Sequence, residues 1–246
     1  MCNTFISGAT GRVGRILIEK VLGDSDLKLV GGSASKGSKE LGKDLGVLIG
    51  KGSINSNIVD KISNENEIDL IIDFSRPQNS IEILRFASKE NIPVVLGTTG
   101  FNETELKYIH KISKEIPLLI APNTSMGITI FKKILGLSKD ILQTASSLEI
   151  LEKHHAEKKD SPSGTAINLK EQLLDILSSE DIQIVSVREG DSPGEHSLIL
   201  SFEGETLEIS HKVSDRSIFA KGAIVAGKWL KDKKPGAYTM QDIYSS

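Results

Sequence analysis

The chain has 246 residues, a formal net charge of −3 and a single cysteine. This length suits two domains, or one domain with an insertion. The slightly acidic charge gives no indication of a nucleic-acid partner. One cysteine excludes an intrachain disulfide, and no signal-peptide pattern is present, so we expect a cytoplasmic protein. The longest charge-free stretch, 116–131, contains polar residues and is too short for a membrane span, so we expect no membrane partner.

The first 125 residues alternate short apolar runs with segments of helical periodicity. Glycine and proline bound the apolar runs, and Pro77 is acceptable in the first turn of a helix. Such alternation indicates a parallel sheet that is covered by helices on both faces. The predicted strands are 4–7, 27–30, 69–74, 92–96 and 117–121, and the predicted helices are 12–22, 77–89 and 103–114.

The pattern changes after residue 125, where we expect a second domain to begin. Three strand-like runs follow one another without helices between them, and Glu203–Gly204 suits a tight hairpin. This order is typical of a mostly antiparallel sheet in an α+β domain. The expected elements are a helix over 126–142, a strand over 147–153, a helix over 165–177, strands over 182–188, 197–202 and 205–212, a final helix over 217–230 that can return to the first domain, and a turn at 233–240.

Residues 8–14, "GATGRVG", lie directly after the first strand and directly before the first helix. They are a spaced variant of the dinucleotide fingerprint G-x-G-x-x-G. Glycines let the backbone approach a pyrophosphate, and the N-terminus of the helix supplies N–H groups and partial positive charge. Glycines at such a turn also occur in connections that bind nothing. The repeated strand–helix units around this loop favour nucleotide binding.

The end of the second strand bears on the type of cofactor. An NAD-binding protein often has an acidic residue there for the ribose hydroxyls, but no acid occurs between Val30 and Glu40. Ser35, Lys36 and Arg12 could instead donate to a 2′-phosphate. We therefore expect NADPH, with NADH also usable. The loops "GTTG" at 97–100 and "APNTS" at 121–125 follow parallel strands and suit the nicotinamide ribose and its carboxamide.

The segment 152–166, "EKHHAEKKDSPSGTA", contains adjacent histidines and admits three interpretations. A metal site is disfavoured because neighbouring residues on a strand point to opposite faces, and because His110, His196 and His211 lie far away in sequence. A solvated surface patch is the second interpretation.

A catalytic site is the third interpretation, and it explains more of the segment. His154 ends an apolar strand and can donate a proton near neutral pH. Lys158 adds positive charge, and the turn Ser163–Thr165 opens a helix whose free N–H groups can bind a carboxylate. These groups suit a small anionic substrate, most simply a polycarboxylate. A Ser-His-Asp nucleophile fits less well, because Ser163 lacks a G-x-S-x-G elbow and no acidic partner is marked for a histidine.

These motifs together resemble the 4-hydroxy-tetrahydrodipicolinate reductase (dihydrodipicolinate reductase) family of bacterial lysine and diaminopimelate synthesis. The resemblance covers almost the whole chain. It is most specific around His154 and also includes "DFSRP" at 73–77, "GTTGF" at 97–101, "APNTSMG" at 121–127 and "DRSIFAKGA" at 215–223.

The resemblance implies an α/β fold with a Rossmann-type parallel sheet over 1–125 and 216–246, completed by the C-terminal helix. It implies a substrate-binding α+β domain over 126–215 that builds a homotetramer. The implied reaction is reduction of a cyclic dicarboxylate to tetrahydrodipicolinate by NADPH or NADH, with loss of water. No metal is implied.

The resemblance also implies the site residues, by position in the matching motifs. His154 corresponds to the proton donor and Lys158 to the second catalytic residue, while the implied substrate contacts are His155, Gly164 and Thr165. The implied cofactor contacts are Gly8, Ala9, Thr10, Gly11, Arg12, Val13, Gly97, Thr98, Thr99, Ala121, Pro122, Asn123 and Thr124.

Two positions depart from the family pattern. Ala34 replaces a frequent acidic residue, which weakens the case for NADH, and Thr124 replaces a frequent aromatic residue, so that contact is expected from the backbone. Two other functions stay open at this point. One is a different NAD(P)-dependent oxidoreductase of similar layout, such as an amino-acid dehydrogenase, and the other is an NADPH-binding protein without catalysis.

Overall fold

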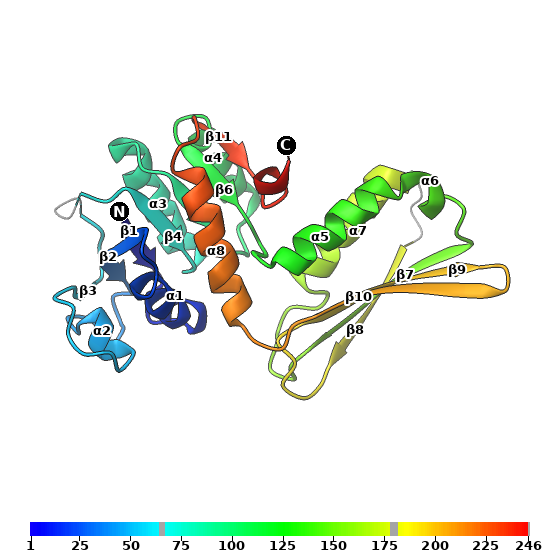
Figure 1. Ribbon diagram of the computed structural model, residues 1–246, viewed down its shortest axis with the longest axis horizontal. Coiled ribbons are helices and arrows are strands. Elements are labelled where there is room, and N and C mark those ends of the chain that lie inside the picture. Colours follow the sequence, from blue (N-terminus) through cyan, green and yellow to red (C-terminus); the bar gives the residue numbers. More distant parts are fainter. Residues whose placement is uncertain (64–66, 178–181, 246) are drawn as a thin grey trace. The chain divides into compact units, whose positions relative to one another are not determined.

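The computed structural model describes residues 1–63, 67–177 and 182–245, and the chain forms two compact units (Figure 1). The first unit comprises Met1–Thr124 and Phe219–Ser246, and the second comprises Ser125–Ile218. Residues 64–66, 178–181 and 246 fall within the expected domain ranges but lie outside the described residues.

The first unit contains a seven-stranded sheet in which every pair of neighbouring strands is parallel. The strand order β11-β6-β5-β4-β1-β2-β3 contains the Rossmann order, with the reversal between β1 and β4. The expected fold class is thereby confirmed for this unit. The strands are β1 (Cys2–Ser7), β2 (Leu27–Ser33), β3 (Ile58–Val59), β4 (Leu70–Asp73), β5 (Val94–Leu96), β6 (Pro117–Ile120) and β11 (Gly236–Tyr238).

Apolar side chains are buried on both faces of this sheet, as parallel strands require. One core cluster includes residues of α1 (Arg12–Leu22) and α8 (Ser217–Leu230), and the other includes residues of α3 (Pro77–Glu90) and α4 (Glu103–Ile112). Two short helical segments complete the unit, α2 (Leu45–Leu48) and η1 (Asp242–Tyr244).

The segment 233–240 was expected to be a turn, and this is wrong for part of it. Gly236–Tyr238 forms β11, which pairs in parallel with Pro117–Leu119 of β6. The strand is three residues long and lies at the edge of the sheet, so it has no alternation that a sequence pattern could show. The two-residue strand β3 and the four-residue helix α2 were missed for the same reason.

The second unit contains a four-stranded mixed sheet in the order β10-β9-β7-β8. Strand β7 pairs in parallel with β8 and antiparallel with β9, and β9 pairs antiparallel with β10, so the expectation of a mostly antiparallel sheet is confirmed. Gly204, with φ +81°, occupies the predicted two-residue hairpin. The strands are β7 (Ser147–His154), β8 (Ile182–Arg188), β9 (Glu195–Phe202) and β10 (Glu205–Lys212).

Helices α5 (Met126–Leu137) and α7 (Gly164–Leu177) lie on one face of this sheet (Figure 1). The single helix expected over 126–142 is divided at Ser138, where a second short helix, α6 (Lys139–Leu142), begins. The Ser138 hydroxyl donates to the Ile134 carbonyl, a local bond that competes with the regular helical pattern. Among the described residues, no helix is long and apolar enough to cross a membrane.

Candidate functional site

At the glycine-rich turn around Gly8, backbone segments pack so closely that two of the positions have no room for a side chain. Gly8 has φ +79°, and a Cβ atom there would lie 2.3 Å from the Phe74 carbonyl oxygen. A Cβ atom on Gly14 would lie 2.1 Å from the Gly8 carbonyl oxygen. A side chain at either position would force the turn open. Glycine at both positions therefore allows the chain to turn tightly from β1 into α1.

This turn borders a cavity of about 210 Å³ at the carboxyl end of the sheet. Gly8, Thr10 and Gly11 line the cavity from one side, and Ala34 and Ser35 line it from the end of β2. Gly11 precedes α1 with extended backbone and no side-chain cap, which leaves the N-terminus of that helix open to an anion. The residues therefore fit a dinucleotide phosphate, and the small Ala34 leaves room where an acid would repel a second phosphate.

A second cavity of about 470 Å³ shares Asn79 with the first. Its lining includes four cationic side chains and two acidic ones. The cations outnumber the acids, so this cavity attracts an anion. The charged residues are Lys36, Lys61, Arg85, Lys89, Asp60 and Glu82.

The remaining residues that the resemblance assigns to the cofactor are spread over three segments of the first unit. Arg12 and Val13 begin α1, and Ala9 is buried beneath the turn. Residues 97–99 follow β5 and residues 121–124 follow β6, so both loops lie at the carboxyl ends of neighbouring strands. This edge of a doubly wound sheet is where ligands bind.

Thr98 and Thr124 use their side chains within the protein. The Thr98 hydroxyl donates to Asp73, and the Thr124 hydroxyl donates to the Phe219 carbonyl at 2.7 Å. A Cβ atom on Gly222 would lie 1.8 Å from the Thr124 carbonyl oxygen, so α8 packs directly on this loop. Any ligand contact at Thr124 therefore falls to its backbone.

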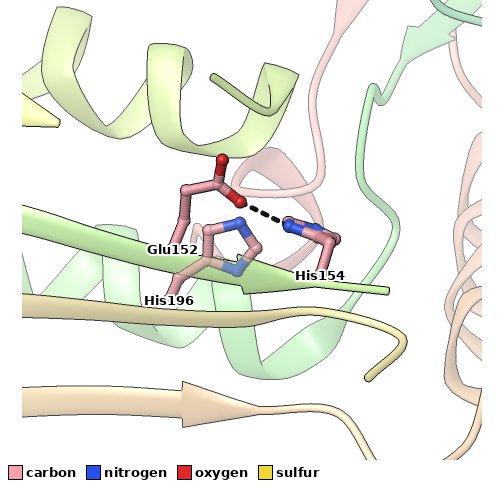
Figure 2. Close-up of side chains that lie close together, drawn as sticks. All are labelled: Glu152, His154 and His196. Atoms are coloured by element: carbon pink, nitrogen blue, oxygen red, sulfur yellow. Dashed lines mark hydrogen bonds and ion pairs between the residues drawn. The ribbon is translucent and has the colours of Figure 1, made fainter. Parts of the chain in front are cut away.

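In the second unit, His154 ends β7 and faces a buried carboxylate on the same strand. Figure 2 shows Glu152 and His154 pointing toward each other, with the ring of His196 beside them. His154 Nδ1 and Glu152 Oε2 form a short hydrogen bond. Residues two apart on a strand share a face, and this spacing brings the carboxylate to the imidazole. The expectation that no acidic partner is available to a histidine is therefore wrong.

Glu152 is completely buried and is held by several donors. Arg188 on β8 donates to Glu152 Oε1 at 2.6 Å, and the Ser163 backbone N–H donates to the same oxygen at 3.2 Å. Burial alone would raise the pKa of Glu152, but the bonds from Arg188 and His154 lower it to about 2. Glu152 is accordingly an anion at neutral pH.

The two ring nitrogens of His154 are in different situations. Burial lowers the pKa of His154 below its ordinary value, and Glu152 acts in the opposite direction by stabilising the protonated ring. Because Nδ1 bonds to Glu152, the other nitrogen, Nε2, is the one that can exchange a proton with a ligand. Gly194 lies next to Nε2, and a Cβ atom on Gly194 would approach it to 3.0 Å.

His196 on β9 is one of three histidines that were set aside as metal ligands because of their distance along the chain. Its ring packs edge-on against His154, with centroids 5.1 Å apart. Its Nε2 atom lies 3.2 Å from the Ser163 hydroxyl. Burial and the neighbouring His154 lower the pKa of His196 to about 3, so it is neutral at pH 7. Only His154 of this pair is therefore suited to proton exchange.

Glu152, His154 and His196 offer three atoms within 4.8 Å of one another, an arrangement that could hold a metal ion. Sequence separation was thus no valid argument against a metal, because antiparallel pairing of β7 with β9 brings the histidines together. The Arg188 guanidinium already occupies Glu152 Oε1, and a second cation there would be repelled. The group fits a hydrogen-bonded network better than a metal centre.

The other predicted residues lie in the loop after β7 and at the start of α7. Lys158 is partly buried, and its Nζ atom lies 2.8 Å from both carboxylate oxygens of Asp160. His155 and Thr165 are partly exposed, and Gly164 is exposed, so a ligand can reach all three. Glu152, Arg188 and His196 were not predicted as site residues. For Glu152 a signal was available, because it lies two residues before His154 on a predicted strand and so shares its face.

A doubly wound sheet with a glycine turn, together with an α+β unit that carries a buried histidine bonded to a carboxylate, is typical of a two-domain dinucleotide-dependent oxidoreductase. Family models match both parts: "Dihydrodipicolinate reductase, N-terminus" over residues 2–124 and "Dihydrodipicolinate reductase, C-terminus" over residues 127–244. The chain belongs to the dihydrodipicolinate reductase family. It is an NAD(P)H-dependent oxidoreductase of lysine and diaminopimelate biosynthesis.

One curated relative supports this family, and two solved structures have a similar fold. A 4-hydroxy-tetrahydrodipicolinate reductase of Hahella chejuensis is 35% identical over 263 residues and covers 99% of this chain and 98% of its own. A dipicolinate-bound dihydrodipicolinate reductase from Paenisporosarcina has a TM-score of 0.79 at 21% identity, covering 99% of both chains. An amine dehydrogenase from Mycobacterium smegmatis has a TM-score of 0.71 at 13% identity, covering 98% of this chain and 95% of its own.

Proposed function

We propose that the protein reduces 4-hydroxy-tetrahydrodipicolinate to tetrahydrodipicolinate in the cytoplasm, with the first unit binding the cofactor and the second binding the substrate. Water leaves the substrate, a hydride adds to the conjugated ring, and a proton neutralises the resulting electron density. The bound nicotinamide supplies the hydride. The observation that carries the proposal is His154, held at the end of β7 by an ionised carboxylate with Nε2 left for proton transfer.

His154 is the proposed proton donor, and Glu152 orients it. The buried carboxylate fixes the hydrogen on Nδ1 and stabilises the imidazolium that donates from Nε2. His196 stays neutral beside it and adds no competing acid. A bound dicarboxylate raises the pKa of His154, because nearby negative charge favours the protonated ring. Substrate binding therefore charges the donor that the reaction uses.

The proposed substrate contacts are His155, Gly164 and Thr165, and Lys158 is the proposed second catalytic residue. Lys158 supplies a cation, and the start of α7 supplies N–H groups and partial positive charge. The Paenisporosarcina relative was solved with dipicolinate, a flat ring with two carboxylates, which supports a substrate of this shape. Two carboxylates held at fixed positions orient the ring for both transfers.

We propose that NADPH is preferred, because the basic cavity beside the glycine turn is suited to a 2′-phosphate. Lys36 directly follows Ser35, which lines the cavity at the glycine turn, and Lys61 lines the same cavity as Lys36. Replacing Lys36 with Met should raise KM for NADPH by about tenfold and leave KM for NADH unchanged, since one phosphate contact of this kind contributes about 1.4 kcal/mol. Lys39, an exposed lysine nearby in sequence, gives a matched control as Lys39→Met.

The test is a coupled assay in which an aldolase forms the substrate from pyruvate and aspartate semialdehyde, run with NADPH and NADH in parallel. The proposal expects turnover with both cofactors and a higher kcat/KM with NADPH. A folded protein that oxidises neither cofactor contradicts the reductase function. A higher kcat/KM with NADH contradicts the stated preference alone. Oxidation of an amino acid in place of this reduction would identify a dehydrogenase of similar fold.

We also propose a homotetramer formed through the second unit. Its sheet has helices on one face, and no helix among the described residues of this unit covers the other (Figure 1). Val185 is 40% exposed, and strand alternation places Val187 on the same open face. Light scattering should give a mass of four times the 26.7 kDa chain mass for the wild type. The Val185→Glu variant should have a lower mass. A wild-type mass equal to that of one chain contradicts the assembly.

A further inference from the structure

Asp73 is a completely buried carboxyl that the proposed reaction does not use. It ends β4, and no ion pair with it occurs within the described parts of the chain. Hydroxyl groups surround it instead. Ser75 Oγ donates to Oδ1 at 2.6 Å, Thr98 Oγ1 donates to Oδ2 at 2.8 Å, and Ser80 Oγ donates to Oδ2 in a short bond. Ser7 contributes a further hydrogen bond. Burying a carboxyl without a cation is costly unless such donors are fixed in place.

These donors come from separate parts of the chain that meet at the carboxyl end of the sheet. Ser7 is the last residue of β1 and precedes the glycine turn, Ser75 follows β4, and Thr98 follows β5. Thr98 Oγ1 also accepts from the Ser75 backbone N–H at 2.9 Å. Asn79 Nδ2 donates to Ser7 Oγ at 2.9 Å. One carboxyl thus joins the loops after three adjacent strands.

Two of these three loops, those after β1 and β4, line the cavity at the glycine turn. Phe74, Ser75, Arg76 and Asn79 all line it, although the sequence reasoning assigned none of them to the cofactor. The Phe74 carbonyl packs against Gly8. A shift of the loop after β4 would therefore change both the cavity and the turn that is expected to hold the phosphates.

We propose that Asp73 is a positioning residue that sets the shape of the dinucleotide cavity by tying these loops together. The inference rests on the proposed use of a nicotinamide cofactor. It predicts that loss of the carboxyl lowers cofactor affinity in a protein that is still folded. A purely structural Asp73 would lower thermal stability and leave the affinity of the folded protein unchanged.

The decisive variant is Asp73→Asn, which keeps the size of the side chain but replaces one acceptor oxygen with an NH₂ donor facing hydroxyl donors. NADPH binding to the free protein is measured by cofactor fluorescence, well below the unfolding temperature of each variant. We expect the Kd to rise about tenfold, equivalent to about 1.4 kcal/mol. KM for NADPH should rise with it, and kcat should change less. Ser80→Ala removes one donor outside the cavity wall and should raise the Kd by a smaller factor.

The matched control is Thr4→Val, in β1 three residues before Ser7. Thr4 is completely buried in β1, and its hydroxyl donates to the Cys2 carbonyl at 3.1 Å. This variant should lower stability and leave the NADPH Kd unchanged. The inference is overturned if the Kd of Asp73→Asn for NADPH lies within twofold of the wild-type value. If Asp73→Asn does not fold, the inference is overturned when the Kd of Ser80→Ala lies within twofold of the wild-type value. Failure of the reductase function would show separately, as wild-type protein that binds NADPH without turnover.

Discussion

Replacing His154 with Gln should lower kcat by about 10²–10⁴-fold, the usual contribution of a general acid. Glutamine retains a polar group near Glu152 but cannot deliver a proton at neutral pH. NADPH affinity should be retained, because the glycine turn and its cavity belong to a different unit of the chain. Steady-state kinetics in the coupled assay, together with cofactor fluorescence, measure the two effects separately.

His110 provides the control for this substitution. It is an exposed histidine on α4, and His110→Gln makes the same chemical change outside the proposed machinery. Its kcat should equal that of the wild type. A His154→Gln enzyme that turns over at the wild-type rate would remove the proton-donor role and leave the source of the proton elsewhere in the second unit or in solvent.

Much of the fold was readable from the sequence because the elements that matter most are long and periodic. β4 and β5 appeared as apolar runs between turn residues, and their parallel arrangement followed from the helices between them. β11 and β3 were not readable, since two or three residues carry no period and depend on an existing sheet edge. The break at Ser138 depends on a local side-chain bond that the apolar pattern does not encode.

The residues of the candidate site also fall into two groups, those that a contiguous motif marks and those that only the fold brings together. The glycine turn and the His154 segment are contiguous motifs, so their residues could be named from sequence. Arg188 and His196 reach Glu152 and His154 only through strand pairing, and nothing local marks either of them. Asp73 falls within the strand predicted over 69–74, and only the meeting of three loops gives it hydroxyl partners.

Replacing Glu152 with Gln should lower kcat by about tenfold to a hundredfold, less than the loss of His154 itself. A neutral amide still accepts a hydrogen bond from Nδ1, but it no longer stabilises the imidazolium. Arg188 would also lose its charged partner, so thermal stability should fall as well. Stability and kcat are measured separately, by thermal unfolding and by assays at a temperature where the variant is folded.

The pH dependence distinguishes an orienting role from a structural one. His154 must be protonated to act as an acid, so activity falls as pH rises through its pKa. Burial lowers that pKa in the free protein, while Glu152 raises it through its hydrogen bond and its charge. The alkaline limb of kcat/KM reports the free enzyme, and the alkaline limb of kcat reports the complex with substrate. The limb of kcat/KM should lie at lower pH than the limb of kcat, because a bound dicarboxylate raises the pKa of His154. Removing the Glu152 charge should move both limbs to lower pH.

Two comparisons make this prediction specific to His154. Glu203→Gln, in the exposed β9–β10 turn, makes the same change of carboxylate to amide and should leave both limbs in place. In a His154→Gln background, Glu152→Gln should reduce kcat little further, because a residue that acts through the imidazole has nothing left to orient. A full additional loss in the double variant, or a pH profile that stays fixed in the single one, would mean that Glu152 supports the fold around β7 without tuning the proton donor.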